Sequence, residues 1–192
     1  MRPLVLASSS PYRRELLQRL QLPFVWQNPN VDEQIRTGEE ASMLVQRLAV
    51  AKAGALRNQF LQHLIIGSDQ VAVLDGQILG KPGNMQAAHE QLRAASGRSL
   101  VFYTGLCLLD SHSGDLRVDC VPFTVHFREL SDGQIHRYLE KERPFNCAGS
   151  FKSEGLGISL FRATEGEDAT ALVGLPLIRL CDMLGQTGIE VP

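Results

Sequence analysis

Cysteine is scarce in this 192-residue sequence, and its spacing excludes the common cysteine-based metal sites. The four cysteines are Cys107, Cys120, Cys147 and Cys181. No Cys-x-x-Cys pair occurs, although structural zinc sites usually take their ligands from such pairs. Small or apolar residues surround each cysteine, which favours buried side chains in a reducing compartment. A zinc-stabilised fold is therefore not expected.

Three further absences narrow the possible function classes. The five histidines are dispersed along the chain, so metal chemistry based on clustered histidines has no support. No run approaches the length of a membrane-spanning helix, and the segment 1–7 is too short and too weakly charged for a signal peptide. Lys and Arg number 19 against 21 Asp and Glu, with no basic stripe, which argues against nucleic-acid binding. The sequence therefore predicts a cytoplasmic protein with neither a membrane nor a nucleic acid as partner.

The composition is otherwise that of a globular protein, because 44% hydrophobic residues supply a sizeable core. Alternating strand and helix signals predict an α/β fold with a mixed sheet. Strands are expected at residues 3–7, 24–27, 64–69, 71–74, 77–79, 100–110, 116–127 and 158–161. Helices are expected at 11–20, 37–57, 84–96, 132–142 and 176–185. No linker, repeat or low-complexity segment interrupts residues 1–192, so we expect a single domain.

Local signals predict where several of these elements begin. Ser10, Asn84 and Ser131 each precede a helical pattern and are typical N-caps. Thr37 begins a segment with the spacing of a capping box. Asp75–Gly76 has the signature of a type I′ turn, which predicts a hairpin between the strands on either side.

The turn after the first expected strand concentrates polar groups. Ser8 and Ser10 precede Pro11, and Arg13 and Arg14 lie in the first turn of the expected helix. Arginines at a helix N-terminus oppose the helix dipole, so the stability of the helix does not explain them. A plain capped helix with two solvated arginines is one interpretation. The other is an anion bound by the free N–H groups and the guanidinium groups.

Asp69 is expected at the end of an apolar strand, where open α/β sheets place ligand groups. A carboxylate there needs a backbone donor, a metal or a proton to move, although an aspartate that caps a turn is a competing interpretation. Lys52 lies at the margin of the apolar face of its helix, and Lys81 lies between a glycine and a proline. Together with Glu33 and the first turn, these residues resemble a polyphosphate site with a metal ion.

The sequence resembles the Maf-like nucleoside triphosphate pyrophosphatases. The matching segments follow one another in order over nearly the whole chain, which is more specific than any one segment alone. They are Leu6–Arg14, Val31–Glu33, Ala51–Lys52, Gly67–Gln70, Gly80–Pro82, Tyr103–Gly105, Ala148–Ser150 and Val173–Pro176. The resemblance implies an elongated, two-lobed molecule similar to inosine triphosphatase, with a twisted mixed sheet and an active site in the cleft.

The same resemblance implies a reaction and a set of roles. The family cleaves a nucleoside triphosphate between the α and β phosphates with the help of a divalent cation, Mg²⁺ or Mn²⁺. Carried over by position, Asp69 is the proton acceptor that activates water, and Glu33 helps to hold the metal. The implied phosphate-binding residues are Ser8, Arg13, Lys52 and Lys81.

Three positions point to one branch of this family. Tyr12, Gln70 and Glu154 resemble the branch that acts on 7-methyl-GTP, whereas the pyrimidine branch typically carries Arg, Thr and Gln there. N7-methylguanine is cationic, so the Tyr12 ring can attract it by about 0.5–2 kcal/mol. Glu154 can accept N–H bonds from the guanine edge. The expected function is hydrolysis of 7-methyl-GTP to 7-methyl-GMP and pyrophosphate, which prevents incorporation of the modified nucleotide.

Two alternatives stay open at this point. One is a pyrophosphatase with pyrimidine or broader specificity. The other is a nucleotide-binding regulator of cell division or septum formation, in which hydrolysis is incidental. The oligomeric state is also open, with a homodimer among the candidates.

Overall fold

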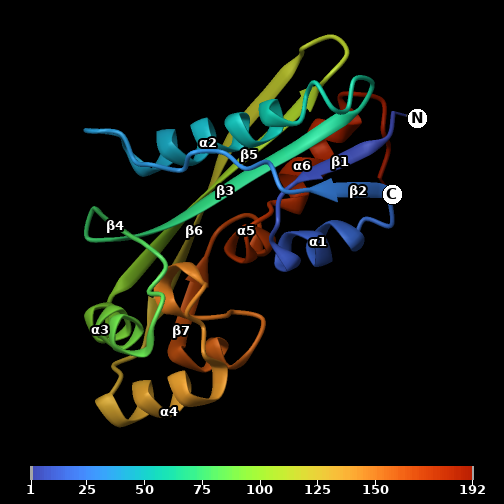
Figure 1. Cartoon of the computed structure of the whole chain (residues 1–192). Coiled ribbons are helices and arrows are strands. Elements are labelled where there is room, and N and C mark those ends of the chain that lie inside the picture. Colours follow the sequence, from blue (N-terminus) through green and yellow to red (C-terminus); the bar gives the residue numbers. More distant parts are fainter. Residues whose placement is uncertain (1, 192) are drawn as a thin grey trace. The chain divides into compact units, whose positions relative to one another are not determined.

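A mixed sheet of seven strands runs through the computed structural model, which describes residues 2–191 (Figure 1). The strands are β1 (Leu4–Ala7), β2 (Phe24–Gln27), β3 (Leu64–Leu74), β4 (Gln77–Leu79), β5 (Ser99–Asp110), β6 (Leu116–Phe127) and β7 (Phe161–Glu165). Their order is β2-β1-β3-β5-β6-β7, and β4 pairs with β3. β1 is parallel to β2 and β3, whereas β4 and β7 are antiparallel to their partners. The predicted α/β class with a mixed sheet is confirmed.

The helices complete two compact units. The helices are α1 (Pro11–Gln18), α2 (Ala41–Ala55), α3 (Met85–Ala95), α4 (Asp132–Glu142), α5 (Ala169–Val173) and α6 (Leu177–Gly185). Two 3-10 segments are η1 (Ala148–Ser150) and η2 (Leu156–Leu160). Unit 1 contains residues 2–70, 104–121 and 168–191, and unit 2 contains residues 71–103 and 122–167. The single domain stays a prediction.

In unit 1, apolar clusters cover both faces of the sheet. On one face, α1 and α6 pack around side chains such as Leu6 and Ile66 (Figure 1). On the other face, α2 packs around Val5 and Ile65. Neighbouring residues of a strand point to opposite faces, so both faces need apolar side chains here. This is why the sequence of β1 is continuously apolar rather than alternating.

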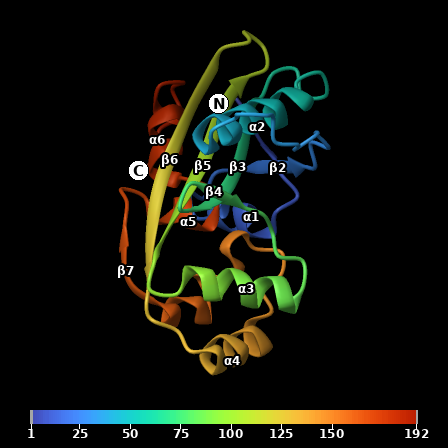
Figure 2. The same ribbon diagram turned by 90° about the vertical axis from the view of Figure 1, so that its left-hand side faces the viewer.

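In unit 2, α3 and α4 lie side by side (Figure 2). Capping residues determine where each of these helices begins. Asn84 accepts a hydrogen bond from the backbone N–H of Ala87 at 2.9 Å and caps α3, as predicted. Ser131 and Gln134 form a reciprocal capping box at the start of α4. The predicted type I′ turn is also present, since Asp75–Gly76 has positive φ angles of 48° and 80° and joins β3 to β4.

The structure shows that two predicted element boundaries were wrong in the first half of the chain. β3 does not end at Asp69 but continues to Leu74, because the polar side chains in its middle find hydrogen-bond or ionic partners. The helix expected from Thr37 begins at Ala41, and its N-cap Glu40 makes no side-chain cap bond. Gly38 has a φ of +74°, which is not helical, so the preceding turn cannot extend the helix.

The strand expected at residues 158–161 was also wrong, and one helix was missed. Residues Leu156–Leu160 form η2, and the strand follows it as Phe161–Glu165. The backbone N–H of Ile158 bonds to the carbonyl of Gly155 at 3.5 Å, which holds the chain in a turn. The sequence analysis did not include the short helix α5, which Asp168 caps.

Asp168 supports the beginnings of two helices. Its Oδ1 atom accepts a bond from the N–H of Thr170 at 2.9 Å, and its Oδ2 atom accepts one from the N–H of Ile178 at 2.8 Å. Pro176, the N-cap of α6, has no side-chain acceptor. Asp168, which precedes Pro176 in the chain and lies outside α6, therefore accepts the hydrogen bond from an N–H group at the start of α6. The carboxylate is buried, and its loss would leave two backbone donors without this partner.

We predict that Asp168→Ala lowers the stability of the protein by about 2–4 kcal/mol, the sum of two lost caps in a buried setting. For a chain of this length the melting temperature should fall by roughly 5–15 °C. Thermal unfolding followed by circular dichroism measures this. Asp182→Ala is the control, because Asp182 is exposed on α6 and should change stability by less than about 0.5 kcal/mol. Equal shifts for the two variants would contradict the double cap.

Candidate active site

Two glycines allow α2 to lie directly on the sheet of unit 1. A side chain on Gly67 of β3 would overlap the backbone carbonyl of Ala49, and one on Gly105 of β5 would overlap that of Val45. Both carbonyls belong to α2, so the helix backbone contacts the strands with no side chain between them. Lys52 lies less than one helical turn after Ala49 on α2. The close approach therefore places Lys52 over Asp69, which lies two residues after Gly67 on β3.

We predict that Gly67→Ala forces α2 away from the sheet and lowers stability by about 3 kcal/mol or more, because the clash is with backbone atoms. Gly54→Ala is the matched control on α2, since a methyl group there meets no atom within 4 Å. It should be neutral or stabilising by up to about 1 kcal/mol. Urea unfolding of both variants measures the difference. A small effect at Gly67 would mean that the helix does not need this contact.

Lys52 bridges two carboxylates in unit 1. Its Nζ atom lies 2.5 Å from Oδ1 of Asp69 and 2.7 Å from Oε1 of Glu33. Lys52 and Asp69 are buried, at 6% and 8% exposure, whereas the Glu33 side chain is half exposed. The structure therefore confirms that Lys52 reaches the sheet, and it places Asp69 in the middle of a strand with a charged partner. Two carboxylates and one ammonium leave this cluster with one net negative charge.

Arg13 approaches the same cluster from α1. Its Nε–H group donates to the carbonyl of Gly174 at 2.7 Å. Burial lowers the pKa of Arg13 from its usual value, while the carboxylates of Asp69 and Glu33 act in the opposite direction. Arg13 therefore lies within electrostatic reach of both carboxylates. Of the cations and carboxylates that the sequence predicted to lie together, Arg13, Lys52, Glu33 and Asp69 are near one another in unit 1, whereas Lys81 is not part of this unit.

A buried serine completes the support for Arg13. Ser68 Oγ lies 2.8 Å from the carbonyl of Gly105 and 2.9 Å from that of Gly174. Gly174 ends α5 with a φ of +117°, a conformation that favours glycine. Its carbonyl thereby accepts bonds from both Arg13 and Ser68. Sequence reasoning gave no role to Ser68 or Gly174, although both lie in the motif segments Gly67–Gln70 and Val173–Pro176.

The turn between β1 and α1 is ordered by its own serines. Ser8 is buried, and its Oγ atom accepts a bond from the N–H of Ser10 at 3.1 Å. Ser10 caps α1 by accepting from the N–H of Arg13 at 3.4 Å, as predicted. Ser8 directly follows the pairing of Ala7 with Gly67 between β1 and β3. The first polar segment of the sequence therefore begins beside the strand that carries Asp69.

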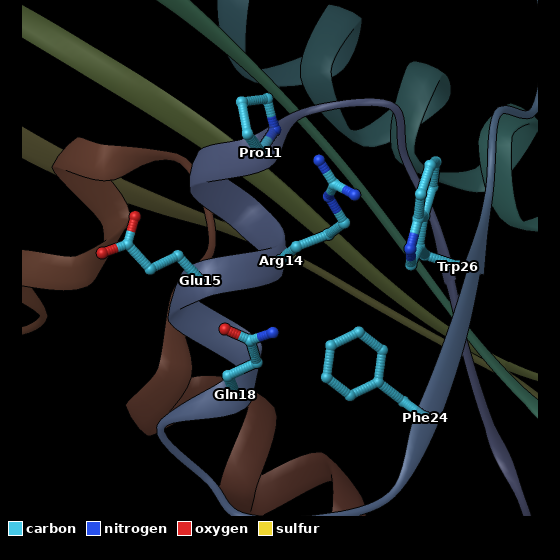
Figure 3. A pocket seen from close by; sticks show the side chains of 6 residues that line it. All are labelled: Pro11, Arg14, Glu15, Gln18, Phe24 and Trp26. Atoms are coloured by element: carbon cyan, nitrogen blue, oxygen red, sulfur yellow. The ribbon is translucent and has the colours of Figure 1, made fainter.

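Arg14 does not join Arg13. Its guanidinium lies over the Trp26 ring, with Cζ 4.1 Å from the ring centroid. Figure 3 shows both side chains in a pocket between α1 and β2. The residues that line this pocket are Pro11, Arg14, Glu15, Gln18, Phe24 and Trp26. The contact with Trp26 gives the second arginine a partner of its own, and Arg13 is the arginine that lies near the Asp69 cluster.

Gln70 and Tyr12, two of the three predicted specificity residues, also lie in unit 1. The Gln70 Nε2 group donates to Thr104 Oγ1 at 3.0 Å and to the carbonyls of Ala171 and Leu172 at 2.7 and 3.1 Å. These bonds fix the side-chain amide of Gln70, the residue that directly follows Asp69 in β3. Tyr12 is half-buried on α1, beside Arg13 in sequence.

Lys81 and Glu154 belong to unit 2. Lys81 is exposed in the segment after β4, where Gly80 accepts a bond from Gln91 at 3.0 Å. Glu154 is exposed in the loop between η1 and η2. They lie outside the unit that holds Asp69, and their roles stay predictions, as do those of the site residues in unit 1.

The donor set of the Asp69 cluster suits a hard divalent cation. Asp69 and Glu33 each place a carboxylate oxygen on the Lys52 ammonium, at 2.5 and 2.7 Å, so the two carboxylates lie close to each other. Mg²⁺ is usually bound by one or two carboxylates together with phosphate oxygens and water. The residues present therefore fit Mg²⁺ or Mn²⁺ in the company of a polyphosphate.

Three of the four thiols have raised pKa values. Burial raises the pKa of Cys107 to about 12, and burial and Asp119 raise that of Cys120 to about 11, so both stay protonated near neutral pH. Within residues 2–191 no disulfide joins the cysteines. In the same part of the chain, every helix is too short or too polar to cross a membrane.

Fold and site together define a class of protein: an α/β protein in which cations and carboxylates cluster on the sheet, around the buried pair Lys52 and Asp69. Its family follows from comparison with known sequences. The family model described as Maf-like protein matches residues 3–187, so the chain belongs to the Maf family.

Similar proteins span the full chain. A 7-methyl-GTP pyrophosphatase of Pseudomonas aeruginosa is 64% identical over 192 residues and covers 100% of both chains. A protein of the same name from Methylobacillus flagellatus is 55% identical over 191 residues, again with 100% of both chains covered. Among solved structures, a HAM1 protein from Coxiella burnetii matches with a TM-score of 0.55 at 16% identity, covering 97% of this chain and 100% of that one. This last similarity supports the fold alone.

Proposed function

We propose that this protein is a 7-methyl-GTP pyrophosphatase, which hydrolyses 7-methyl-GTP to 7-methyl-GMP and pyrophosphate. The full-length relative at 64% identity has this name. The observation that carries the proposal is the buried Asp69–Lys52 pair at 2.5 Å, with Glu33 and Arg13 close to it. Hydrolysis of this nucleotide would keep a modified base out of nucleic acid synthesis.

In this proposal Asp69 is the general base. Its carboxylate accepts a proton from the water whose oxygen forms a bond to the α phosphorus, while the bond from that phosphorus to the bridging oxygen of the leaving pyrophosphate breaks. Lys52 lies at hydrogen-bond distance from the base and holds it in place.

Cations bind the phosphates in this scheme. Arg13 and Lys52 lie at the Asp69 cluster, and Ser8 adds a hydroxyl group at the end of β1. Lys81 is a further phosphate-binding cation of the proposal. Positive charge at these points offsets the negative charge that develops on the leaving pyrophosphate.

Glu33 would help to hold a divalent cation, Mg²⁺ or Mn²⁺, that arrives with the nucleotide, close to the Asp69 base. When bound, such an ion neutralises phosphate charge and polarises a phosphoryl oxygen. Lys52 neutralises the same two carboxylates in this structure.

Tyr12, Gln70 and Glu154 would recognise the base. The Tyr12 ring can stack with the cationic 7-methylguanine, and the Glu154 carboxylate can accept N–H bonds from its edge. The Gln70 amide nitrogen is already bonded within unit 1, so its amide oxygen is the group it can offer to a ligand.

A panel of nucleoside triphosphates tests the reaction, with pyrophosphate release as the readout in the presence of Mg²⁺ or Mn²⁺. We expect 7-methyl-GTP to have the highest kcat/KM. A higher value for UTP or CTP would favour the pyrimidine alternative. Binding of nucleotide without release of pyrophosphate would favour a regulator of cell division.

We predict that Glu154→Gln selectively impairs hydrolysis of 7-methyl-GTP. The amide keeps one acceptor but loses the negative charge, and its NH₂ group opposes a donor of the guanine edge. A mismatched pair of donors typically costs about 1–3 kcal/mol, so the preference for 7-methyl-GTP over UTP should fall roughly ten- to a hundredfold. The kcat/KM values for both substrates in both proteins measure this. An equal loss on both substrates would assign Glu154 to catalysis instead of base recognition.

The remaining parts of the proposal concern location and assembly. We place the protein in the cytoplasm, because dispersed cysteines among small or apolar residues favour a reducing compartment. A homodimer stays a prediction, which the mass in solution by light scattering would test.

A further inference from the structure

The loop that carries Glu154 is bound to α4 on both sides of that residue. The backbone N–H of Lys152 donates to Tyr138 Oη at 3.1 Å, and the N–H of Leu156 donates to Glu142 Oε2 at 2.8 Å. Tyr138 and Glu142 lie four residues apart on α4 and therefore on the same face of the helix. Two backbone points that flank Glu154 are thus bound to one rigid element.

The loop also closes on itself beneath Glu154. The N–H of Gly155 bonds to the carbonyl of Lys152 at 3.3 Å. A side chain on Gly157 would overlap that same carbonyl, so only glycine allows the chain to return so closely. Ser153 Oγ donates to Glu154 Oε2 at 3.1 Å and orients the carboxylate. Glu154 therefore lies exposed in a short, internally bonded turn.

The N-terminal end of the loop is fixed in the core of unit 2. The Phe151 ring packs edge-to-face on Phe161, with centroids 4.7 Å apart, and on Phe102 and Phe127 at 5.4 and 5.6 Å. Such aromatic pairs restrict the position of the backbone that carries them. The turn thus begins at a residue that is packed among aromatic rings, and it is then bound to α4 at two points.

Glu142 also controls the charge near Glu154. Its Oε1 atom lies 3.5 Å from Lys152 Nζ, and its backbone carbonyl accepts a bond from the same ammonium at 3.1 Å. Lys152 is only two residues from Glu154 and would otherwise be available to neutralise it. By binding Lys152, Glu142 leaves the negative charge of Glu154 available to a cation.

We propose that Tyr138 and Glu142 are positioning residues that set the substrate selectivity of this protein by holding the turn of Glu154. The inference rests on the proposed function, in which the Glu154 carboxylate faces a cationic base. Recognition of a base edge needs a carboxylate fixed within a fraction of an ångström, and helices provide that more reliably than loops do. Neither residue contacts the phosphates or the Asp69 cluster in this scheme, so turnover of substrates that do not use Glu154 should be preserved.

The test compares variants in the ratio of kcat/KM for 7-methyl-GTP to that for UTP. The two hydrogen bonds that Tyr138 and Glu142 accept from the loop are called the clamp. Tyr138→Phe removes one acceptor of the clamp, and Glu142→Ala removes the other together with the partner of Lys152. Each should lower the ratio about five- to tenfold, the effect of losing one hydrogen bond, with kcat/KM for UTP within about twofold of the parent. Glu142→Gln keeps an acceptor for the Leu156 N–H and should largely restore the ratio. Glu140→Ala, an exposed change on α4, is the control.

Two reference measurements separate this inference from the proposed function. If Glu154→Gln lowers the ratio while Tyr138→Phe and Glu142→Ala do not, the clamp is overturned and the function of Glu154 stands. Hydrogen exchange of the amides of residues 152–156 tests the clamp without any substrate. Exchange should be about fivefold faster in Tyr138→Phe and Glu142→Ala than in Glu140→Ala. Unchanged exchange, or an equal loss of kcat/KM on both nucleotides, would overturn the inference even if 7-methyl-GTP proved a poor substrate.

Discussion

Asp69→Asn should reduce kcat by about a thousandfold while the protein stays folded. Removal of a general base typically costs a factor of about 10²–10⁴, and the amide cannot accept the proton of the attacking water. The change conserves volume, and the amide oxygen can still accept the bond from Lys52, which lies 2.5 Å from the carboxylate. Lys52 also keeps its contact with Glu33 at 2.7 Å. Pyrophosphate release from 7-methyl-GTP measures the effect.

The same strand offers a matched control for this variant. Asp75 follows β3 in the type I′ turn and forms an exposed pair with Arg98 at 2.9 Å. Asp75→Asn makes the same chemical change at a position where Asn-Gly is a preferred turn sequence, so activity and stability should be kept. Calorimetric titration should show that Asp69→Asn still binds the nucleotide. Activity of Asp69→Asn within about tenfold of the parent, or about 1.4 kcal/mol, would exclude Asp69 as the base.

The sequence was sufficient for those parts of the fold that depend on neighbouring residues. The N-caps Ser10, Asn84 and Ser131 and the turn Asp75–Gly76 occur where local chemistry predicted them. Each depends on contacts within about four residues, which a sequence displays directly. Boundaries that depend on distant contacts were wrong. The sequence suggested that β3 ends at its polar residues, although partners elsewhere in the chain allow it to continue.

The candidate site likewise combines features that neighbouring residues predict with features that depend on distant contacts. Its residue types were predictable, because Asp69, Lys52, Glu33 and Arg13 stand out as charges beside apolar segments. Their geometry was not, because Lys52 is brought to Asp69 by the packing of α2 on glycines of β3 and β5. The divergence of Arg13 and Arg14 was hidden for the same reason, since it depends on the Trp26 ring of another element.

Lys52→Met should lower both turnover and stability. The side chain of methionine fills much of the same space but leaves the buried carboxylate of Asp69 without its cation, and Glu33 loses the same partner. Breaking a buried ion pair by removing one partner costs about 3–5 kcal/mol. We expect a loss near the lower end of this range, because Glu33 is half exposed and can turn toward water. Urea unfolding measures it, with Lys141→Met on the exposed face of α4 as the control.

The double variant Lys52→Met with Asp69→Asn distinguishes an unpaired charge from lost packing. If the destabilisation arises from the bare carboxylate, converting Asp69 to a neutral amide should recover about 1–3 kcal/mol of the stability lost in Lys52→Met. If it arises from imperfect packing of methionine under α2, the second change should recover nothing, and the two effects should add. Turnover should be lost in all three variants, because each removes either the base or the cation beside it. Additive destabilisation would therefore exclude the role of Lys52 as the internal counter-ion of Asp69 while leaving Asp69 as the base.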